Sequence, residues 1–248
     1  MVSSVAVAGA SGRLGSLVCE VVESHPDFEL VAKLTSKSGA DEGAEADILV
    51  DVTSPEVSQE IVERALGRGQ QVLIGTSGWS AERIAGLEQT MSQFADQGAI
   101  VVPNFSLGSV LGTALAQIAA PYFASIEVIE AHHPKKIDSP SGTAVRTAEL
   151  MAEAREAANS EPLLAPFTEQ RARGELVAGI PVHSLRLTGV VAKQEVRFGG
   201  PGEVLCLVHD THSNDAYVAG IRAALEAVRE ARGVTVGLDS VLGIGRSE

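Results

Sequence analysis

VAVAGASGRLG, residues 5–15, combines a short apolar strand, a turn with glycines at positions 9, 12 and 15, and the start of a helix. When such a turn joins the first strand and first helix of a parallel sheet, a pyrophosphate can approach the positive end of the helix. The spacing is one residue wider than the commonest dinucleotide-binding form, and glycine turns on their own are a weak signal. Their position after the first predicted strand favours a dinucleotide-binding loop.

The first half of the chain alternates short β-branched runs with helical stretches. Strands are predicted at residues 4–8, 28–34, 47–52, 71–75 and 99–102, and helices at residues 14–24, 55–66 and 81–95. This alternation is typical of a parallel sheet that helices cover on both faces. We therefore predict an α/β protein whose N-terminal part is a Rossmann-type domain.

The second half has a different pattern. It contains predicted helices at 107–120 and from 143, a strand at 126–133 and a polar loop at 161–179. Long strands are predicted at 182–188, 192–198 and 204–209, and the short connections at 189–190 and 199–202 suit antiparallel hairpins. A last helix at 216–232 resumes the pattern of the first half. The predicted domains are a dinucleotide-binding domain at 1–105 and 214–248, and a mixed α+β domain at 106–213.

The composition is that of an ordinary globular protein, with 45% hydrophobic and 21% charged residues. The net charge of −13 argues against nucleic-acid binding. An anionic ligand therefore needs a local group of cations, for which the candidates are Arg13, Lys33, Lys37, Lys135 and Lys136. Cys19 and Cys206 are predicted to be buried, reduced thiols. The sequence shows no leader and no membrane-spanning run, so together with these thiols it predicts a cytoplasmic protein.

Residues 130–144, EAHHPKKIDSPSGTA, place two histidines and two lysines directly before a predicted helix. The N–H groups of Gly142 and Thr143 are expected at the positive end of that helix, where a glycine lets a carboxylate or phosphate approach closely. The lysines add positive charge, and the histidines can move a proton near neutral pH. This stretch therefore predicts a site that holds an acidic small molecule and transfers a proton.

Other interpretations of the same stretch are a structural role and a metal site. A half-buried histidine pair and a solvated lysine face are common structural features, but their combination before one helix favours function. His132, His133 and Asp138 are the potential metal ligands. Adjacent imidazoles in an extended segment point to opposite faces, and no CxxC, HxxxH or HxxE spacing accompanies them, so the pattern disfavours a metal.

The residues after the second predicted strand bear on the choice of cofactor. An NAD-binding domain usually places an acid there, about 20 residues past the glycines, on the ribose hydroxyls. This chain has Lys33-Leu34-Thr35-Ser36-Lys37-Ser38 and no acid before Asp41. Hydroxyls and lysines favour a 2′-phosphate, so NADPH is the predicted cofactor and NADH the alternative, although a solvated loop has the same composition. The loops at 75–78 and 102–105 follow later strands of the sheet and are expected at the nicotinamide end.

Five segments of the chain together resemble the dihydrodipicolinate reductase (4-hydroxy-tetrahydrodipicolinate reductase) family. They are GASGRLG, GTSGW, VPNFSLG, EAHHPKKIDSPSGTA and GIPVHSLRLTGVVAKQEVRFG, of which the fourth is highly specific and the glycine loop is not. The resemblance implies a Rossmann-type domain, a second domain for substrate binding and oligomerisation, and a homotetramer. It also implies NAD(P)H-dependent reduction of dihydrodipicolinate, formed from 4-hydroxy-tetrahydrodipicolinate, to tetrahydrodipicolinate in lysine and diaminopimelate biosynthesis.

The same resemblance implies roles for individual residues. The implied catalytic residues are His132 and Lys136, and the implied contacts to the substrate carboxylates are His133, Lys136, Ser141, Gly142 and Thr143. The implied cofactor contacts are Gly9, Ala10, Ser11, Gly12, Arg13 and Leu14 in the phosphate loop, and Gly75, Thr76, Ser77, Val102, Pro103, Asn104 and Phe105 around the nicotinamide. The residues expected to select NADPH, namely Thr35, Ser36 and Lys37, complete the predicted cofactor site.

Two positions depart from the family pattern, and two rival functions fit parts of the sequence. Asn214 stands where relatives often have arginine, and Thr35 where actinobacterial-type relatives often have an acid. One rival is another NADPH oxidoreductase of a small dicarboxylate, such as an amino-acid dehydrogenase. The other is a non-catalytic sensor of NADP(H), which the HHPKK cluster disfavours because a sensor needs no proton donor there.

Overall fold

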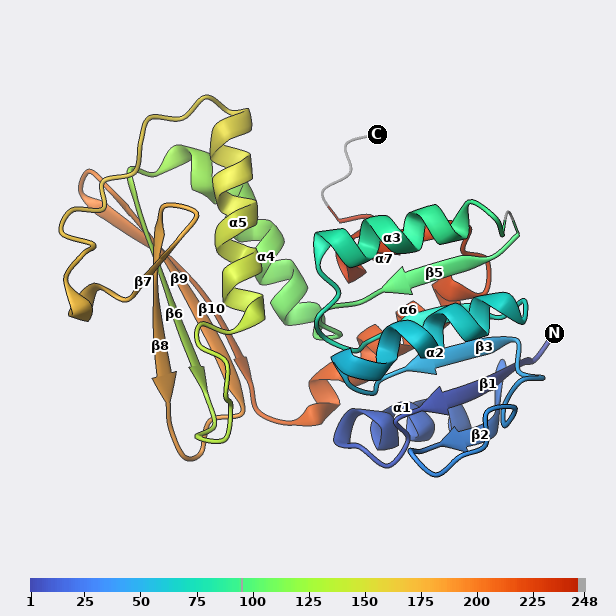
Figure 1. Cartoon of the computed structure of the whole chain (residues 1–248). Coiled ribbons are helices and arrows are strands. Elements are labelled where there is room, and N and C mark those ends of the chain that lie inside the picture. The colour runs from blue at the N-terminus through green and yellow to red at the C-terminus, as the bar shows by residue number, and fades with distance from the viewer. Residues whose placement is uncertain (95, 245–248) are drawn as a thin grey trace. The chain divides into compact units, whose positions relative to one another are not determined.

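The computed structural model of the chain describes residues 1–94 and 96–244. The chain divides into two compact units (Figure 1). The first unit comprises Met1–Leu107 and Tyr217–Glu248, and the second comprises Gly108–Ala216. The second unit is therefore an insertion between two parts of the first. Within the described residues, no helix is both long and apolar enough to cross a membrane.

The first unit contains a six-stranded parallel sheet in the order β11-β5-β4-β3-β1-β2. The strands are β1 (Ser3–Ala8), β2 (Phe28–Leu34), β3 (Ile48–Asp51), β4 (Gln71–Ile74), β5 (Gly98–Val101) and β11 (Gly233–Val236). The helices are α1 (Arg13–Glu23), α2 (Pro55–Gly67), α3 (Ala81–Met91), α6 (Val218–Val228) and α7 (Leu238–Leu242). This architecture confirms the predicted α/β class with a Rossmann-type parallel sheet.

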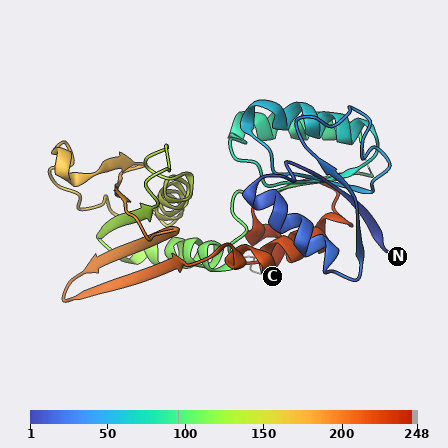
Figure 2. The same ribbon diagram turned by 90° about the horizontal axis from the view of Figure 1, so that it is seen from below.

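The central strands of this sheet are buried on both faces, as their continuous apolar sequences require. Every residue of β3 and β5 is buried. Helices α2 and α3 cover one face, and α1 and α6 cover the other (Figure 2). One core cluster includes Leu49, Leu66 and Ile74, from β3, α2 and β4.

The C-terminal part of the first unit differs from the prediction of one helix at residues 216–232. A 3-10 turn at Asn214–Tyr217 precedes α6, which ends at Val228, and β11 then adds a sixth strand beside β5. Gly233, with a φ of +66°, begins this strand after the helix has ended. Four residues are too few for a periodicity signal, so only pairing with β5 reveals β11 as a strand. Helix α3 ends at Met91, and the predicted end at residue 95 lies outside the described residues.

The second unit contains a five-stranded mixed sheet in the order β10-β9-β6-β8-β7. The strands are β6 (Ser125–His132), β7 (Glu175–Val177), β8 (Ile180–Arg186), β9 (Ala192–Gly200) and β10 (Glu203–Thr211). Helices α4 (Leu107–Ala119) and α5 (Gly142–Ala157) lie over one face of this sheet (Figure 1), with a 3-10 turn at Ala120–Tyr122 after α4 and another at Arg171–Arg173. Their core cluster includes Ala116, Val128, Met151 and Phe198.

The strand order corrects one of the two predicted hairpins. Strands β9 and β10 form an antiparallel hairpin around residues 201–202, as predicted, but β8 and β9 do not pair. Strand β6 lies between them, parallel to β8 and antiparallel to β9. The chain must therefore cross about 9.6 Å, twice the usual strand separation, which is too far for a two-residue turn. The connection passes the end of β6, where the N–H of Leu187 donates to the C=O of His132 at 2.9 Å.

Two smaller expectations for the second unit are also wrong. The predicted loop at 161–179 contains the short strand β7, which pairs antiparallel with β8. Three residues give no recognisable alternation, so the pairing partner determines this strand as well. Cys19 is buried as predicted, but Cys206 is exposed because it lies on the edge strand β10, whose residues are mostly exposed.

Candidate active site

The glycine turn after β1 has two glycines that packing requires. Gly9 has a φ of +85°, and a Cβ atom there would lie 2.4 Å from the carbonyl oxygen of Val52. A Cβ atom at Gly15 would lie 2.1 Å from the carbonyl oxygen of Gly9, so this glycine lets α1 pack against the turn. Gly12 is less constrained, because its Cβ atom would lie 3.2 Å from the same oxygen. Close backbone packing therefore explains Gly9 and Gly15 better than Gly12.

The N-terminus of α1 is suited to an anion. The structure describes its whole first turn, in which no residue is acidic and no side chain caps the helix. Ser11, Gly12 and Arg13 are exposed at this end, Leu14 is partly buried and Ala10 is buried. The free N–H groups and the helix dipole favour a negative charge at this position. The predicted phosphate loop therefore fits a pyrophosphate group.

The loop after β2 lies beside the phosphate loop. The N–H groups of Gly9 and Ala10 both donate to the C=O of Leu34, at 3.1 and 3.2 Å. The turn that follows is closed by its own hydroxyls. Thr35 Oγ1 accepts from the N–H of Lys37 at 3.2 Å, and Ser38 Oγ accepts from the N–H of Thr35 at 3.1 Å.

This turn exposes its polar side chains next to the place where a cofactor phosphate would bind. Thr35, Ser36 and Lys37 are all exposed. Lys33, another predicted cation, instead pairs with Glu23 at 2.8 Å. The residues of the turn thus fit a cofactor with an additional phosphate group, whereas Lys33 forms an ion pair with Glu23.

The loops after β4 and β5 meet through a glycine. A Cβ atom at Gly75 would lie 2.6 Å from the ring of Phe105, which is buried. The N–H of Val102 donates to the C=O of Ile74 at 2.7 Å, which joins the two strands just before their loops. The two predicted nicotinamide loops are therefore neighbours at the carboxyl edge of the sheet.

Other residues of these loops have structural contacts. Thr76 is buried, and its Oγ1 accepts from the N–H of Thr53 at 2.8 Å. Asn104 Oδ1 accepts from the N–H of Ser106 at 2.9 Å, which closes the turn after β5. Ser77, Gly78 and Pro103 are the exposed residues of the two loops.

The sequence prediction did not include Asp51, at the end of β3. Its side chain is fully buried and accepts hydrogen bonds from the hydroxyls of Thr53, at 2.5 Å, and Ser58. Ser58 Oγ in turn accepts from the indole N–H of Trp79 at 2.9 Å. This network fixes the loop after β3 at the same edge of the sheet. An acid directly after the apolar run at residues 48–50 was the signal for it in the sequence.

In the second unit, the histidines and lysines of the specific motif connect β6 to α5. His132 is the last residue of β6, and the N–H of Lys136 donates to the C=O of His133 at 3.1 Å, which forms a turn. Helix α5 begins at Gly142. Ser141 is its N-cap, and its buried hydroxyl accepts from the N–H of Ala144 at 3.3 Å.

The first residues of α5 leave room for a ligand. A Cβ atom at Gly142 would meet no atom within 4 Å, and Gly142 does not have a positive φ. Neither packing nor backbone conformation therefore requires a glycine at this position. Thr143 is partly buried, and its C=O accepts from the hydroxyl of Thr147 at 2.8 Å. His133 is also partly buried, whereas Lys135 is exposed.

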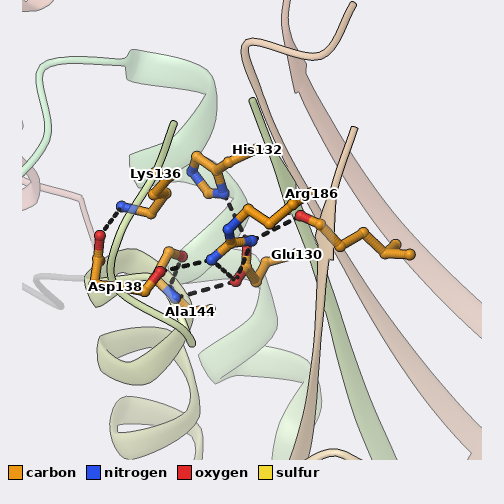
Figure 3. Close-up of polar contacts among 8 residues, drawn as sticks. Glu130, His132, Lys136, Asp138, Ala144 and Arg186 are labelled. Carbon is orange, nitrogen blue, oxygen red and sulfur yellow. Dashed lines mark hydrogen bonds and ion pairs between the residues drawn. The ribbon is translucent and has the colours of Figure 1, made fainter. Parts of the chain in front are cut away.

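Lys136 is paired with a carboxylate of the same loop. Its Nζ lies 2.8 Å from Oδ1 of Asp138 (Figure 3). Burial opposes ionisation of Asp138, but hydrogen bonds from Lys136 and from the N–H groups of Asp138 and Gly142 hold the pKa of this carboxyl below its ordinary value. The ammonium group and the helix N-terminus predicted to bind substrate thus both face a carboxylate of the chain itself.

Glu130, which the sequence prediction did not single out, lies at the centre of the site (Figure 3). Its side chain is fully buried. Oε1 accepts from both terminal nitrogens of Arg186 at 3.0 Å and from the N–H of Ser141 at 3.2 Å. Burial alone raises the pKa of Glu130, but the hydrogen bonds from Arg186, Ser184 and His132 outweigh it and keep this pKa below its ordinary value.

His132 is bonded to the same carboxylate. Its Nδ1 lies 2.6 Å from Oε2 of Glu130, and its side chain is 16% exposed. Burial lowers the pKa of His132, and this effect is larger than the increase that Glu130 causes. The positive charges of Lys136 and Arg186 lower this pKa further. Arg186 also donates to the C=O of Asp138 at 2.6 Å, so one guanidinium joins the strand that bears His132 to the loop that bears Lys136.

The structure thus brings together most of the predicted residues of the second unit and adds Glu130, Ser184 and Arg186. These three lie on the same side of neighbouring strands, because β6 and β8 pair Glu130 with Ser184 and His132 with Arg186. No group of three or more His, Cys, Asp and Glu side chains converges as a metal site in the part of the chain that the structure describes. A buried carboxylate–imidazole pair beside an ammonium group and a helix N-terminus can bind an anion and handle a proton.

Two family models match the chain in succession. "Dihydrodipicolinate reductase, N-terminus" matches residues 3–105, and "Dihydrodipicolinate reductase, C-terminus" matches residues 108–242. The chain is 56% identical over 247 residues to a 4-hydroxy-tetrahydrodipicolinate reductase from Clavibacter michiganensis, a match that covers 100% of this chain and 88% of the relative. A Streptomyces coelicolor protein with the same name is 43% identical, with 96% of this chain and 97% of the relative covered.

A solved structure is also similar over almost the whole length. It is a dihydrodipicolinate reductase from Paenisporosarcina sp. TG-14 with dipicolinate bound. It superposes with a TM-score of 0.80 at 31% identity, covering 97% of this chain and 99% of the other. These similarities confirm the resemblance found in the sequence: the chain belongs to the dihydrodipicolinate reductase family of nicotinamide-dependent oxidoreductases.

Proposed function

We propose that the chain reduces dihydrodipicolinate, which forms from 4-hydroxy-tetrahydrodipicolinate, to tetrahydrodipicolinate in lysine and diaminopimelate biosynthesis. Membership of the family supports this reaction. The observation that carries the proposal is the site between β6 and α5, where Lys136, the N-terminus of α5 and the His132–Glu130 pair lie together. A small cyclic dicarboxylate needs this combination of cations, N–H donors and a group that handles protons.

One substrate carboxylate binds at the start of α5. The N–H groups of Gly142 and Thr143 donate to it, and Lys136, His133 and Ser141 complete the contacts. The open space at Gly142 supports this assignment, because a glycine that packing does not require suits close approach of a ligand. Nζ of Lys136 lies 2.8 Å from Oδ1 of Asp138. The incoming carboxylate therefore exchanges with Asp138 on the ammonium group.

The cofactor binds to the first unit, which is residues 1–105 and 214–248 in the proposed domain assignment. When bound, a reduced nicotinamide cofactor supplies the hydride for the ring double bond of the substrate. The phosphate loop holds its pyrophosphate at the N-terminus of α1, and the loops at 75–77 and 102–105 surround the nicotinamide. Ser36 and Lys37 favour the 2′-phosphate of NADPH over NADH, and their exposure beside the phosphate loop supports this preference.

Residues of the second unit, 106–213, supply the proton that the adjacent ring carbon must take up. Lys136 and His132 are the two candidates. The lowered pKa of His132 favours a neutral imidazole, while the ammonium group of Lys136 pairs with Asp138 nearby. A bound dianion favours the protonated form of a nearby imidazole, so His132 can donate once substrate is in place, and the ammonium group of Lys136 is the other candidate donor.

The enzyme assembles as a homotetramer through the second unit and works in the cytoplasm. Strand β10 is an edge strand of nine residues on which Val204, Leu205 and Val208 are exposed, and this apolar edge supports pairing between copies. A free, exposed thiol at Cys206 suits a reducing compartment.

The test is oxidation of NADPH and NADH by the purified protein, with dihydrodipicolinate generated in the cuvette from pyruvate and aspartate semialdehyde by its synthase. Turnover is expected, with a lower KM for NADPH, and His132→Gln should lower kcat with little change in cofactor affinity. A folded protein that binds NADPH but does not turn over would disprove the proposal. Turnover of simple keto acids with ammonia instead would assign it to an amino-acid dehydrogenase.

A further inference from the structure

The contacts of Glu130 reach beyond the residues to which the family resemblance assigns roles. Glu130 and His132 are two residues apart on β6, so their side chains point to the same face of the sheet. The carboxylate contacts the imidazole through one oxygen and the N-cap of α5 through the other. Arg186 contacts both oxygens, at 3.0 Å each. All of these contacts come from separate parts of the chain and meet on one side chain.

The chemistry of these contacts fixes where the proton of His132 lies. An ionised carboxylate accepts hydrogen bonds and cannot donate them. Glu130 is ionised because Arg186 and Ser141 both donate to it. Nδ1 of His132, at 2.6 Å, must therefore be the donor, and this nitrogen carries the proton of the neutral ring. The remaining nitrogen, Nε2, has its lone pair available for a ligand.

Arg186 extends the same arrangement to the loop. Besides its bonds to Glu130, the guanidinium donates to the C=O of Asp138, two residues after Lys136. Because Lys136 also pairs with the Asp138 side chain, Arg186 fixes the residue that holds the ammonium group. Glu130 and Arg186 thus connect both members of the proposed catalytic pair, although neither has to touch the substrate.

We propose that Glu130 is a positioning residue of the reductase, which fixes His132 as the Nδ1–H tautomer and leaves Nε2 available to the substrate. Arg186 fixes the positions of Glu130 and of the loop that bears Lys136. This inference rests on the proposed function for its effect on turnover. The tautomer itself is independent of the identity of the substrate. Carboxylates that orient an imidazole in this way usually change activity when they are removed, even where the fold survives.

If Glu130 had a purely structural role, it would form the same ion pair with Arg186. The test therefore needs a measurement that a change in protein stability does not affect. The chain offers a matched control three residues earlier on β6. Glu127 also contacts one histidine and one arginine: its Oε2 lies 2.5 Å from Nε2 of His183, and its Oε1 bonds Arg173. By strand alternation, Glu127 faces the opposite side of the sheet from Glu130.

The experiment compares wild type, Glu130→Gln and Glu127→Gln by NMR with histidines labelled with heavy nitrogen, and by the pH profile of kcat/KM. The chain has six histidines, and the His132 signal is identified by its loss in His132→Gln. In wild type, Nδ1 of His132 is expected to give the signal of a protonated ring nitrogen and Nε2 that of an unprotonated one. Because a glutamine amide can donate as well as accept, Glu130→Gln should mix the two tautomers. It should also lower kcat/KM by at least about tenfold. The part of the pH profile of kcat/KM that reflects protonation of His132 should shift.

Glu127→Gln should leave the His132 tautomer, the pH profile and kcat/KM unchanged. If Glu130→Gln does not fold because Arg186 is left unpaired, the double variant Glu130→Leu with Arg186→Met removes both buried charges and keeps an apolar volume. This double variant must show the same change of tautomer. Arg186→Lys should keep the tautomer but raise KM, since Glu130 remains and the loop contact is lost.

The inference is overturned if wild-type His132 carries its proton on Nε2, or if the tautomer and pH profile persist in folded protein without Glu130. Equal losses of kcat/KM in Glu130→Gln and Glu127→Gln would also overturn it, because they would indicate a general structural effect. If wild type has the Nδ1–H tautomer but no turnover on dihydrodipicolinate, the proposed function fails while the positioning of His132 stands.

Discussion

Nζ of Lys136 lies 2.8 Å from Oδ1 of Asp138, so a carboxylate of the chain already occupies the ammonium group proposed to bind substrate. Binding is then an exchange of one carboxylate for another. Because the two carboxylates compete for one ammonium group, Asp138 weakens the binding of a carboxylate ligand at Lys136.

Asp138→Asn should strengthen the binding of a dicarboxylate such as dipicolinate, because it removes the competing charge. The Asp138 side chain is 58% exposed, so solvent screens the pair, and pairs of this kind contribute roughly 0.2–1 kcal/mol. The expected fall in Kd is therefore at most about fivefold. Titration calorimetry measures it, with Asp210→Asn as a control for the loss of one negative charge elsewhere in the second unit. Weaker binding in Asp138→Asn would mean that Asp138 positions Lys136 and is not displaced.

Gly142→Ala separates ligand binding from stability. Because the added Cβ meets no atom and the backbone is helical, alanine should leave the free energy of unfolding unchanged or raise it by up to about 1 kcal/mol. The same methyl group occupies the space of the proposed substrate carboxylate, so Kd for dipicolinate should rise about tenfold or more. Urea unfolding and calorimetry measure the two effects. Unchanged affinity would exclude the start of α5 as the carboxylate site.

The glycines of the phosphate loop should respond differently to alanine. Gly15→Ala should lower the free energy of unfolding by about 1–3 kcal/mol or more, because its Cβ would lie 2.1 Å from the carbonyl oxygen of Gly9. Gly12→Ala, with a 3.2 Å approach, should retain a folded protein but weaken NADPH binding. Thermal unfolding and fluorescence titration with NADPH measure the two variants in parallel. An equally unstable Gly12→Ala would assign that glycine to packing.

Lys37→Ala should raise the KM for NADPH about tenfold while leaving the KM for NADH unchanged, since a charge-assisted hydrogen bond contributes roughly 1.5–3 kcal/mol. Lys33→Ala removes the same charge from a lysine that is paired with Glu23, and it should change neither constant. The measurement is steady-state kinetics with both cofactors. If both KM values move together in Lys37→Ala, the turn after β2 does not recognise the 2′-phosphate.

Acidification should destabilise the fold through His132. Its pKa is lower in the folded chain than in the unfolded chain, so below about pH 6.5, the ordinary pKa of histidine, the unfolded state binds more protons. The free energy of unfolding therefore falls as the pH drops through this range. Urea unfolding at several pH values should show a shallower slope in His132→Gln than in wild type. His209, whose pKa burial also lowers, contributes the same trend in both proteins, and equal slopes would contradict the prediction.

The sequence was sufficient for the parts of the fold that depend on local patterns. Strand β2 has the predicted bounds, and the glycine turn lies between β1 and α1 as expected. Strands β7 and β11 were not predictable, because three or four residues carry no periodicity and their pairing partners define them. The insertion of β6 between β8 and β9 was also not predictable, since strand order depends on contacts between distant segments.

The same distinction applies to the site. His132, Lys136 and Gly142 lie within eleven residues, so their grouping was visible in the sequence. Glu130 and Arg186 are 56 residues apart, and only the parallel pairing of β6 with β8 brings them together. Glu130 follows Glu127 on the same strand, so no signal in the sequence distinguished the site carboxylate from its neighbour. Nothing in the sequence alone indicated that Arg186 was its partner.

The placement of the second unit as an insertion has a consequence for how the protein is made. Strand β5 is synthesised before the second unit, but its parallel neighbour β11 lies at residues 233–236, near the end of the chain. Throughout synthesis of the inserted unit, one side of β5 is an unpaired sheet edge, which is the kind of surface that promotes aggregation. The inserted unit is complete before the first unit can close its sheet. Early release of the nascent chain, before α6 and β11 emerge from the ribosome, would therefore leave a finished second unit attached to an open parallel sheet.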